Sequence, residues 1–184
     1  MKKTVLKFGF MSGGLSAVMM LATVPFIYTI GFDWATVVGY TEMVISFLFV
    51  YFGIRSYRDN VLGGRIGFGR AFGAGMLITL ISCVCYVVAG EIIFSNLLPD
   101  FVDRYSAYLI EGLKARGAST AEIELQAAQI AEFRTMYANP LIRAALTFLE
   151  PFPVGLLITT ISALVLRRKT ERSADLPFGA HEMK

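Results

Sequence analysis

An apolar run over residues 147–166 limits what this chain can fold into more than any other feature. Its twenty residues carry one charge, Glu150, and Arg167, Arg168 and Lys169 follow at once. At ~1.5 Å of rise per residue, a helix of this length crosses a hydrocarbon core of about 30 Å. We therefore expect a transmembrane helix that ends at a basic segment.

Three further apolar runs occupy about 8–32, 35–54 and 72–94. Of the 184 residues, 55% are hydrophobic and 17% are charged, whereas soluble domains carry about 25% charged residues. The sequence thus predicts an all-α fold with four transmembrane helices, which form one membrane domain over residues 1–169. We expect the polar remainder, 170–184, to be a disordered cytoplasmic tail.

The section between the third and fourth spans has the pattern of an amphipathic helical hairpin at about 99–138. Apolar and aromatic residues recur at helical spacing in both of its halves. Gly117 suits the end of the first helix, and Ser119 with Glu122 forms a capping box for the second. The hairpin is expected either to lie on the membrane surface or to cap the bundle.

The basic residues predict the orientation of the spans. Twelve Lys and Arg residues fall on the side of the termini and the second loop, and five fall on the side of the hairpin. The positive-inside rule then places both termini in the cytoplasm and the hairpin outside. Because the charges lie at helix ends, the net charge of +3 indicates a lipid bilayer as partner and not a nucleic acid.

Three acids inside the spans are the candidate functional residues: Glu42, Glu91 and Glu150. The predicted orientation places all three in the outer half of the bilayer, with Glu42 about 10 Å deep. Pro151 and Pro153 lack N–H groups, so the carbonyls four residues earlier lose their usual helical donors. Free carbonyls beside carboxylates are typical of sites that hold a cation or a proton.

A purely structural role for these acids stays open. Arg143 lies two helical turns before Glu150, and Arg104 lies in the hairpin, so either arginine could neutralise a carboxylate. Glu42 could be protonated and hydrogen-bonded near Tyr40 or Thr79. The fourth span could also begin at Pro151, because proline is favoured in the first turn of a helix, although residues 152–166 are then short of the ~20 needed.

Small residues recur at four-residue spacing in two spans: Gly9 and Gly13 in the first, and Gly69 and Gly73 at the start of the third. Such faces let helices approach closely in lipid. Together with the hairpin, they are candidate surfaces for a second copy or another membrane protein.

Residues for covalent or metal chemistry are scarce. The one histidine, His181, is in the tail, and Cys83 and Cys85 point about 200° apart on a helix, too far for an ordinary disulfide. We expect no enzyme, no cofactor and no metal site. Two functions remain: a non-enzymatic scaffold or accessory subunit, which we favour from the sequence, and an oligomeric ion- or proton-coupled carrier that uses the three glutamates.

Several motifs resemble those of a bacterial membrane-protein family, the domain of unknown function four-one-nine-nine. They are Ser-Tyr-Arg-Asp at 56–59, Gly-Gly at 63–64, residues 68–75, Glu91, Phe-Val-Asp-Arg-Tyr at 101–105, Gly-Ala-Ser-Thr at 117–120, Asn-Pro-Leu at 139–141 and residues 148–167. The resemblance covers nearly the whole chain. It implies a small bacterial inner-membrane protein with four helices, and it transfers no catalytic residues.

Overall fold

The computed structural model describes residues 1–167, and every element in that range is a helix. In chain order they are α1 (Lys2–Thr23), the 3-10 turn η1 (Val24–Phe26), α2 (Ile27–Ile30), α3 (Phe32–Val61), α4 (Phe68–Asn96), α5 (Phe101–Ala115), α6 (Thr120–Tyr137), α7 (Pro140–Leu149) and α8 (Pro151–Leu166). The tail predicted over 170–184 lies outside the described residues.

Four helical stretches are long and apolar enough to cross a membrane. They are Lys2–Ile30, which joins α1, η1 and α2, then α3, then α4, and last Pro140–Leu166, which joins α7 and α8. The predicted all-α fold with four candidate spans is therefore confirmed.

The bundle is polar at several points inside and apolar outside, as lipid requires. Val18, Leu157 and Val165 are each more than half exposed. Hydroxyl side chains fill part of the interior, and those that are buried include Ser12, Ser16, Ser46, Thr79, Ser82, Thr159 and Ser162. Small and hydroxyl residues therefore mediate helix contacts beside large buried apolar side chains such as Phe47, Ile54 and Ile78.

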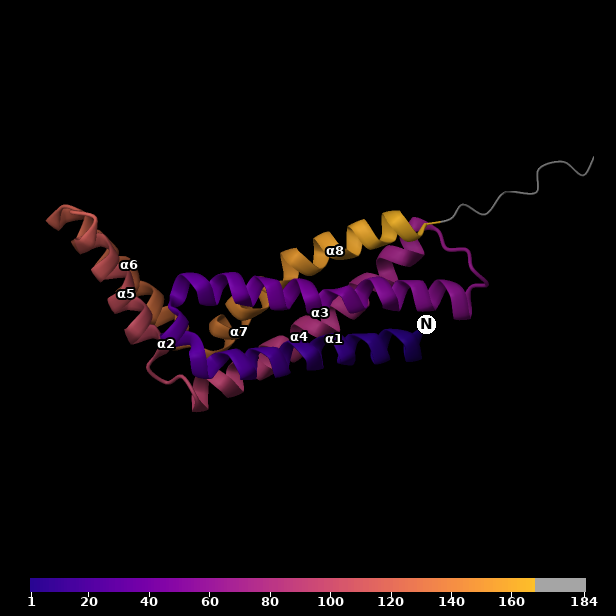
Figure 1. Cartoon of the computed structure of the whole chain (residues 1–184), viewed down its shortest axis with the longest axis horizontal. Helices are drawn as coiled ribbons and strands as arrows, with labels where there is room; N and C mark the ends of the chain where they lie inside the picture. Colours follow the sequence, from indigo (N-terminus) through magenta and orange to yellow (C-terminus); the bar gives the residue numbers. More distant parts are fainter. Residues whose placement is uncertain (168–184) are drawn as a thin grey trace, which may run out of the picture.

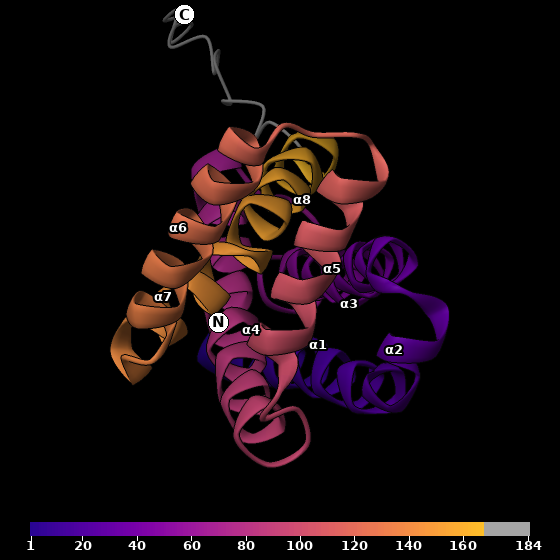
Figure 2. The ribbon, with the colours of Figure 1, turned by 90° about the vertical axis from the view of Figure 1, so that its left-hand side faces the viewer.

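Helices α3 and α4 form the centre of the bundle, since α1 and α8 each pack against both of them. The N-terminus and the end of α8 lie at one end of the bundle, and α5 and α6 project from the other end (Figure 1). Seen from that second end, α5 and α6 lie in front of the helix ends (Figure 2). Because the number of spans is even, the chain enters the first span and leaves the last span at the same end of the bundle.

The first small-residue face is used inside the chain. A Cβ on Gly9 would come within 2.8 Å of Ile81, and a Cβ on Gly13 would overlap Cys85, so both glycines let α1 approach α4 closely. Gly69 and Gly73, in contrast, are exposed and have no neighbour within 4 Å of a Cβ position. Of these two faces, the second is the one that residues 1–167 leave uncovered.

The predicted hairpin is present as α5 and α6. Gly117 turns the chain with φ of 71°, a left-handed conformation that favours glycine. The capping box is complete: the Ser119 hydroxyl accepts from the Glu122 amide, and the Glu122 carboxylate accepts from the Ser119 amide at 2.8 Å. An ion pair between Arg134 and Asp103 joins the two helices at 2.6 Å.

The fourth span differs from the continuous helix predicted over 147–166. Helix α7 ends at Leu149 and α8 begins at Pro151, while the backbone of Glu150 between them stays in the right-handed helical region. The missing N–H groups of Pro151 and Pro153 interrupt the hydrogen-bond ladder without unwinding the chain. The span reaches membrane length because α7 extends it back to Pro140.

Candidate functional site

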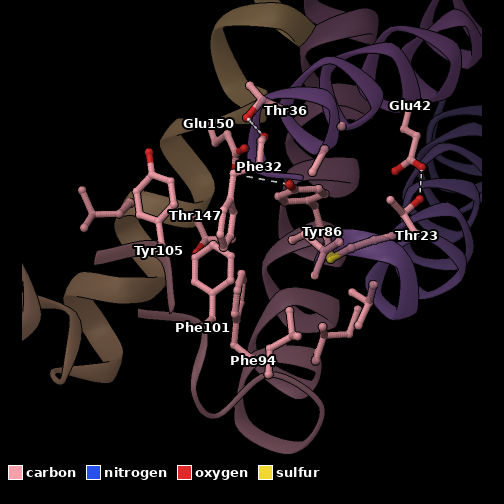
Figure 3. Close-up of a pocket in the computed structure, with 18 of the residues that line it drawn as sticks. Thr23, Phe32, Thr36, Glu42, Tyr86, Phe94, Phe101, Tyr105, Thr147 and Glu150 are labelled. Atoms are coloured by element: carbon pink, nitrogen blue, oxygen red, sulfur yellow. Dashed lines mark hydrogen bonds between the residues drawn. The ribbon is translucent and has the colours of Figure 1, made fainter. Parts of the chain in front are cut away.

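A cavity of about 440 Å³ lies at the hairpin end of the bundle. Its walls come from all four spans and from the hairpin, and they include several aromatic side chains (Figure 3). Those aromatic residues are Phe32, Tyr86, Phe94, Phe101, Tyr105, Phe133 and Tyr137. Two of the three predicted acids, Glu42 and Glu150, line the same cavity.

Glu150 occupies the break between α7 and α8, so its side chain is held at the point where the helix is interrupted. The Tyr86 hydroxyl on α4 donates a hydrogen bond to the Glu150 carboxylate at 3.3 Å. Figure 3 shows the two side chains pointing toward each other. Tyr86 also lies close enough to Glu42 to interact with it electrostatically. The same phenol is therefore near both acids.

Glu42, on α3, meets the first span. The Thr23 hydroxyl contacts the Glu42 carboxyl and also the carbonyl oxygen of Met19, the latter at 3.0 Å. The Thr23 hydroxyl is the donor to Glu42, so this contact gives the carboxyl a neutral polar partner and no positive charge.

The third acid, Glu91, lies outside this cavity and is neutralised. Arg143 donates three hydrogen bonds of 2.9, 3.1 and 2.5 Å to its carboxylate, and these bonds link α7 to α4. Arg143 thus pairs with Glu91 and not with Glu150, the neighbour that its sequence spacing suggests. The guanidinium also lies 5.8 Å from the centre of the Tyr137 ring, which borders the cavity.

Arg104 takes no part in the cavity either. It pairs with Asp100 at 2.5 Å and lies 4.4 Å from the ring centre of Tyr28, whose hydroxyl donates to Asp100 at 3.1 Å. The hydrogen bond from Arg104 holds the pKa of Asp100 below its ordinary value, and the bond from Tyr28 acts in the same direction. This group fastens the start of the hairpin to the end of the first span.

The two cavity acids have no basic partner within residues 1–167. The ion pairs in that range join arginines to Asp59, Asp100, Asp103 and Glu91. Thr79, expected as a neighbour of Glu42, instead bonds Thr159 at 2.8 Å. An acid in a membrane span is costly unless it is paired, protonated or used. Glu42 and Glu150 are therefore the strongest candidates for a working site.

The roof of the cavity is the aromatic face of the hairpin. Phe32, at the start of α3, contacts Phe101, Tyr105 and Tyr108 with ring centres 6.0, 5.2 and 5.1 Å away. Phe94, near the end of α4, contacts Phe101 at 5.1 Å. The hairpin contacts the bundle mainly through these rings. It therefore covers the cavity with side chains, while its backbone packs little against the spans.

Sequence reasoning predicted the aromatic stripe of α5 but not that it roofs a cavity, and it missed Tyr86 and Thr23. A signal for Tyr86 was present, because it is a phenol in the middle of an apolar run. Pro151 is fully buried beside the acid, which is consistent with its role in shaping the break. In the described range, no three His, Cys, Asp or Glu side chains gather closely enough to hold a metal ion.

Comparisons with known proteins identify a family for this chain. No curated protein and no solved structure matches the chain. A family model matches residues 7–168, a range that includes most of the first candidate span, the other three spans, the hairpin and both cavity acids. The chain therefore belongs to the family described as protein of unknown function, DUF4199.

Proposed function

We propose that the protein is a proton-coupled carrier whose working groups are the carboxyls of Glu42 and Glu150. The observation that supports this most is their convergence on one cavity without a basic partner in the described range. A protein that needed these acids only for structure would pair them, as it pairs Glu91 with Arg143. Catalysis is not part of the proposal.

The carrier would work in a bacterial inner membrane with both termini in the cytoplasm and the hairpin outside. The distribution of basic residues supports this orientation. The cavity would then face the outer side. Four spans with no evident internal repeat suggest that two copies act together, and the exposed face at Gly69 and Gly73 is the surface that we assign to their contact.

Proton-coupled flux in reconstituted vesicles tests the proposal. The purified protein is placed in liposomes with a pH-sensitive dye inside, a proton gradient is imposed, and inorganic and organic cations are added one at a time. The comparison includes Glu42→Gln and Glu150→Gln, with Glu124→Gln as the matched control, because Glu124 is an exposed acid of the hairpin.

We expect at least one cation to drive a pH change in wild-type and Glu124→Gln vesicles. Both cavity variants should fall to the rate of empty vesicles, because a glutamine amide cannot take up and release the proton. Wild-type vesicles that match empty ones for every cation would rule out the carrier.

A scaffold or accessory-subunit role is the second candidate. The exposed glycines Gly69 and Gly73 favour it, because nothing in the described range covers them. Cross-linking through cysteines placed at these two positions in native membranes would capture the partner. Cross-links only between copies of this chain would favour the carrier dimer, and none at all would remove this candidate.

A further inference from the structure

We propose that the cavity between α3, α4 and α7 binds a lipophilic organic cation, which exchanges with a proton on Glu150 or Glu42. The inference rests on the carrier function proposed above and adds the chemical class of the substrate. The cavity volume of about 440 Å³ is in the range that small-molecule pockets occupy.

The charge of the cavity selects a cation. Its two carboxyls have no arginine or lysine partner in the described range, so either of them would repel an anionic headgroup once it has released its proton. Arg143, the nearest guanidinium on α7, already holds Glu91 through three hydrogen bonds. A positive ligand supplies the countercharge for a carboxylate that has released its proton.

The lining selects an organic cation over an inorganic one. Calcium and magnesium need about six oxygen ligands at short distance, whereas the walls here are mostly apolar and aromatic side chains. The rings of Phe32, Phe94, Phe101 and Tyr105 line the cavity and can attract a cation, as aromatic rings do when proteins recognise substituted ammonium groups. A cation that carries apolar substituents would pair with the carboxylate and also pack against the aromatic rings.

The helix arrangement offers such a ligand a route from the bilayer. Helix α7 packs against α4, α6 and α8, while the packing partners of α3 are α1, α2, α4 and α8. The cavity lies between α3 and α7, where the two helices are not extensively packed. The break at Glu150 separates the direction of α7 from that of α8 (Figure 1). A lipophilic ligand could therefore enter sideways, below the hairpin.

The exchange balances in charge. A protonated carboxyl releases its proton as the cation arrives, so the site has the same net charge before and after. The groups facing the acids from the packed elements are Tyr86 on α4 and Tyr137 on α6, and both have their phenol close enough to interact electrostatically with Glu150. Neither group supplies a positive charge that would compete with the ligand.

Equilibrium binding to the purified full chain in detergent tests the inference. The probe is tetraphenylphosphonium, and triphenylphosphine oxide is its neutral counterpart with similar rings. Calorimetry in two buffers with different protonation enthalpies gives the affinity and the number of protons released.

We expect tetraphenylphosphonium to bind wild type with proton release, and the neutral compound to bind at least about tenfold more weakly. Glu150→Gln should weaken cation binding at least about tenfold and lower the number of protons released. Glu42→Gln provides the same test should Glu150→Gln fail to fold.

Two variants of α5 distinguish a direct contact between the cavity rings and the cation from a general effect on the stability of the hairpin. Phe101 and Tyr108 both contact Phe32, but only Phe101 lines the cavity. Phe101→Leu should weaken cation binding several-fold, on the order of one cation–π contact, whereas Tyr108→Leu should leave it unchanged. Equal losses of affinity in both variants would contradict cation binding by the cavity rings.

The outcomes keep this inference distinct from the proposed function. Equal affinity for the neutral compound, or no binding of tetraphenylphosphonium to wild type, would overturn the organic-cation site. Glu150-dependent flux with an inorganic cation would then leave the carrier standing. Binding with proton release but no flux in vesicles would remove the carrier and keep the site.

Discussion

The ion pair between Glu91 and Arg143 should couple α4 to α7 by a measurable free energy. The two side chains are 27% and 19% exposed. Opposite charges ~4 Å apart attract by ~4 kcal/mol at an effective dielectric constant of ~20, and partial loss of hydration offsets part of this. Exposed pairs contribute up to ~1 kcal/mol, and breaking a buried pair costs ~3–5 kcal/mol. We therefore expect a coupling of about 1–3 kcal/mol for this half-buried pair.

A double-mutant cycle measures that coupling. Glu91→Gln, Arg143→Gln and the double variant are unfolded by sodium dodecyl sulfate in mixed micelles and followed by circular dichroism. Each single variant should lose stability, and the double variant should lose less than the sum. A control cycle of Arg143→Gln with Glu124→Gln should be additive within ~0.5 kcal/mol. Additivity in the first cycle as well would refute the idea that this pair fastens the two helices.

Three further predictions concern packing, the hairpin anchor and the cap. A Cβ on Gly155 would lie 2.5 Å from Thr79, so Gly155→Val should destabilise the bundle by about 1–3 kcal/mol in the same unfolding assay, and an unchanged midpoint would contradict the close helix approach. Because the pKa of Asp100 is lowered by Arg104, the contribution of this contact is complete above the ordinary value of about 3.9 and is lost as pH falls through the lowered pKa. The protection factors of amides in α5, which correct for intrinsic exchange, should fall there in wild type and stay constant in Asp100→Asn, and the same change in both would contradict it. Ser119→Ala should cost about 1 kcal/mol of helix stability, seen as faster exchange in the first turn of α6, and unchanged exchange would contradict the capping box.

Local patterns predicted the elements of this fold well. Membrane-length apolar runs have few alternatives to a helix, because a backbone in lipid must satisfy its own hydrogen bonds. The capping box at Ser119 and Glu122 and the turn at Gly117 were also readable, because both are set by interactions within a few residues. The two prolines after Glu150 signalled lost helical donors, but not that the fourth span would extend back to Pro140 as α7.

The pairing of charges across helices could not be read in the same way. Spacing along one helix tells which side chains share a face, but not how that face is rotated relative to another helix. Arg143 sits at helical spacing from Glu150 yet bonds Glu91, which is 52 residues away in the sequence. The convergence of Glu42 with Glu150, and the exclusion of Glu91 from their cavity, depends on the same rotations.

The partners of the membrane acids also set an order for biosynthesis. The ribosome makes the N-terminal spans first. Glu42 contacts Thr23, which is 19 residues earlier, and Glu150 contacts Tyr86, which is 64 residues earlier, so each of these acids emerges after its partner. Glu91 emerges 52 residues before Arg143. Helix α4 is therefore made before the arginine that neutralises its acid, and translation of α7 supplies that partner.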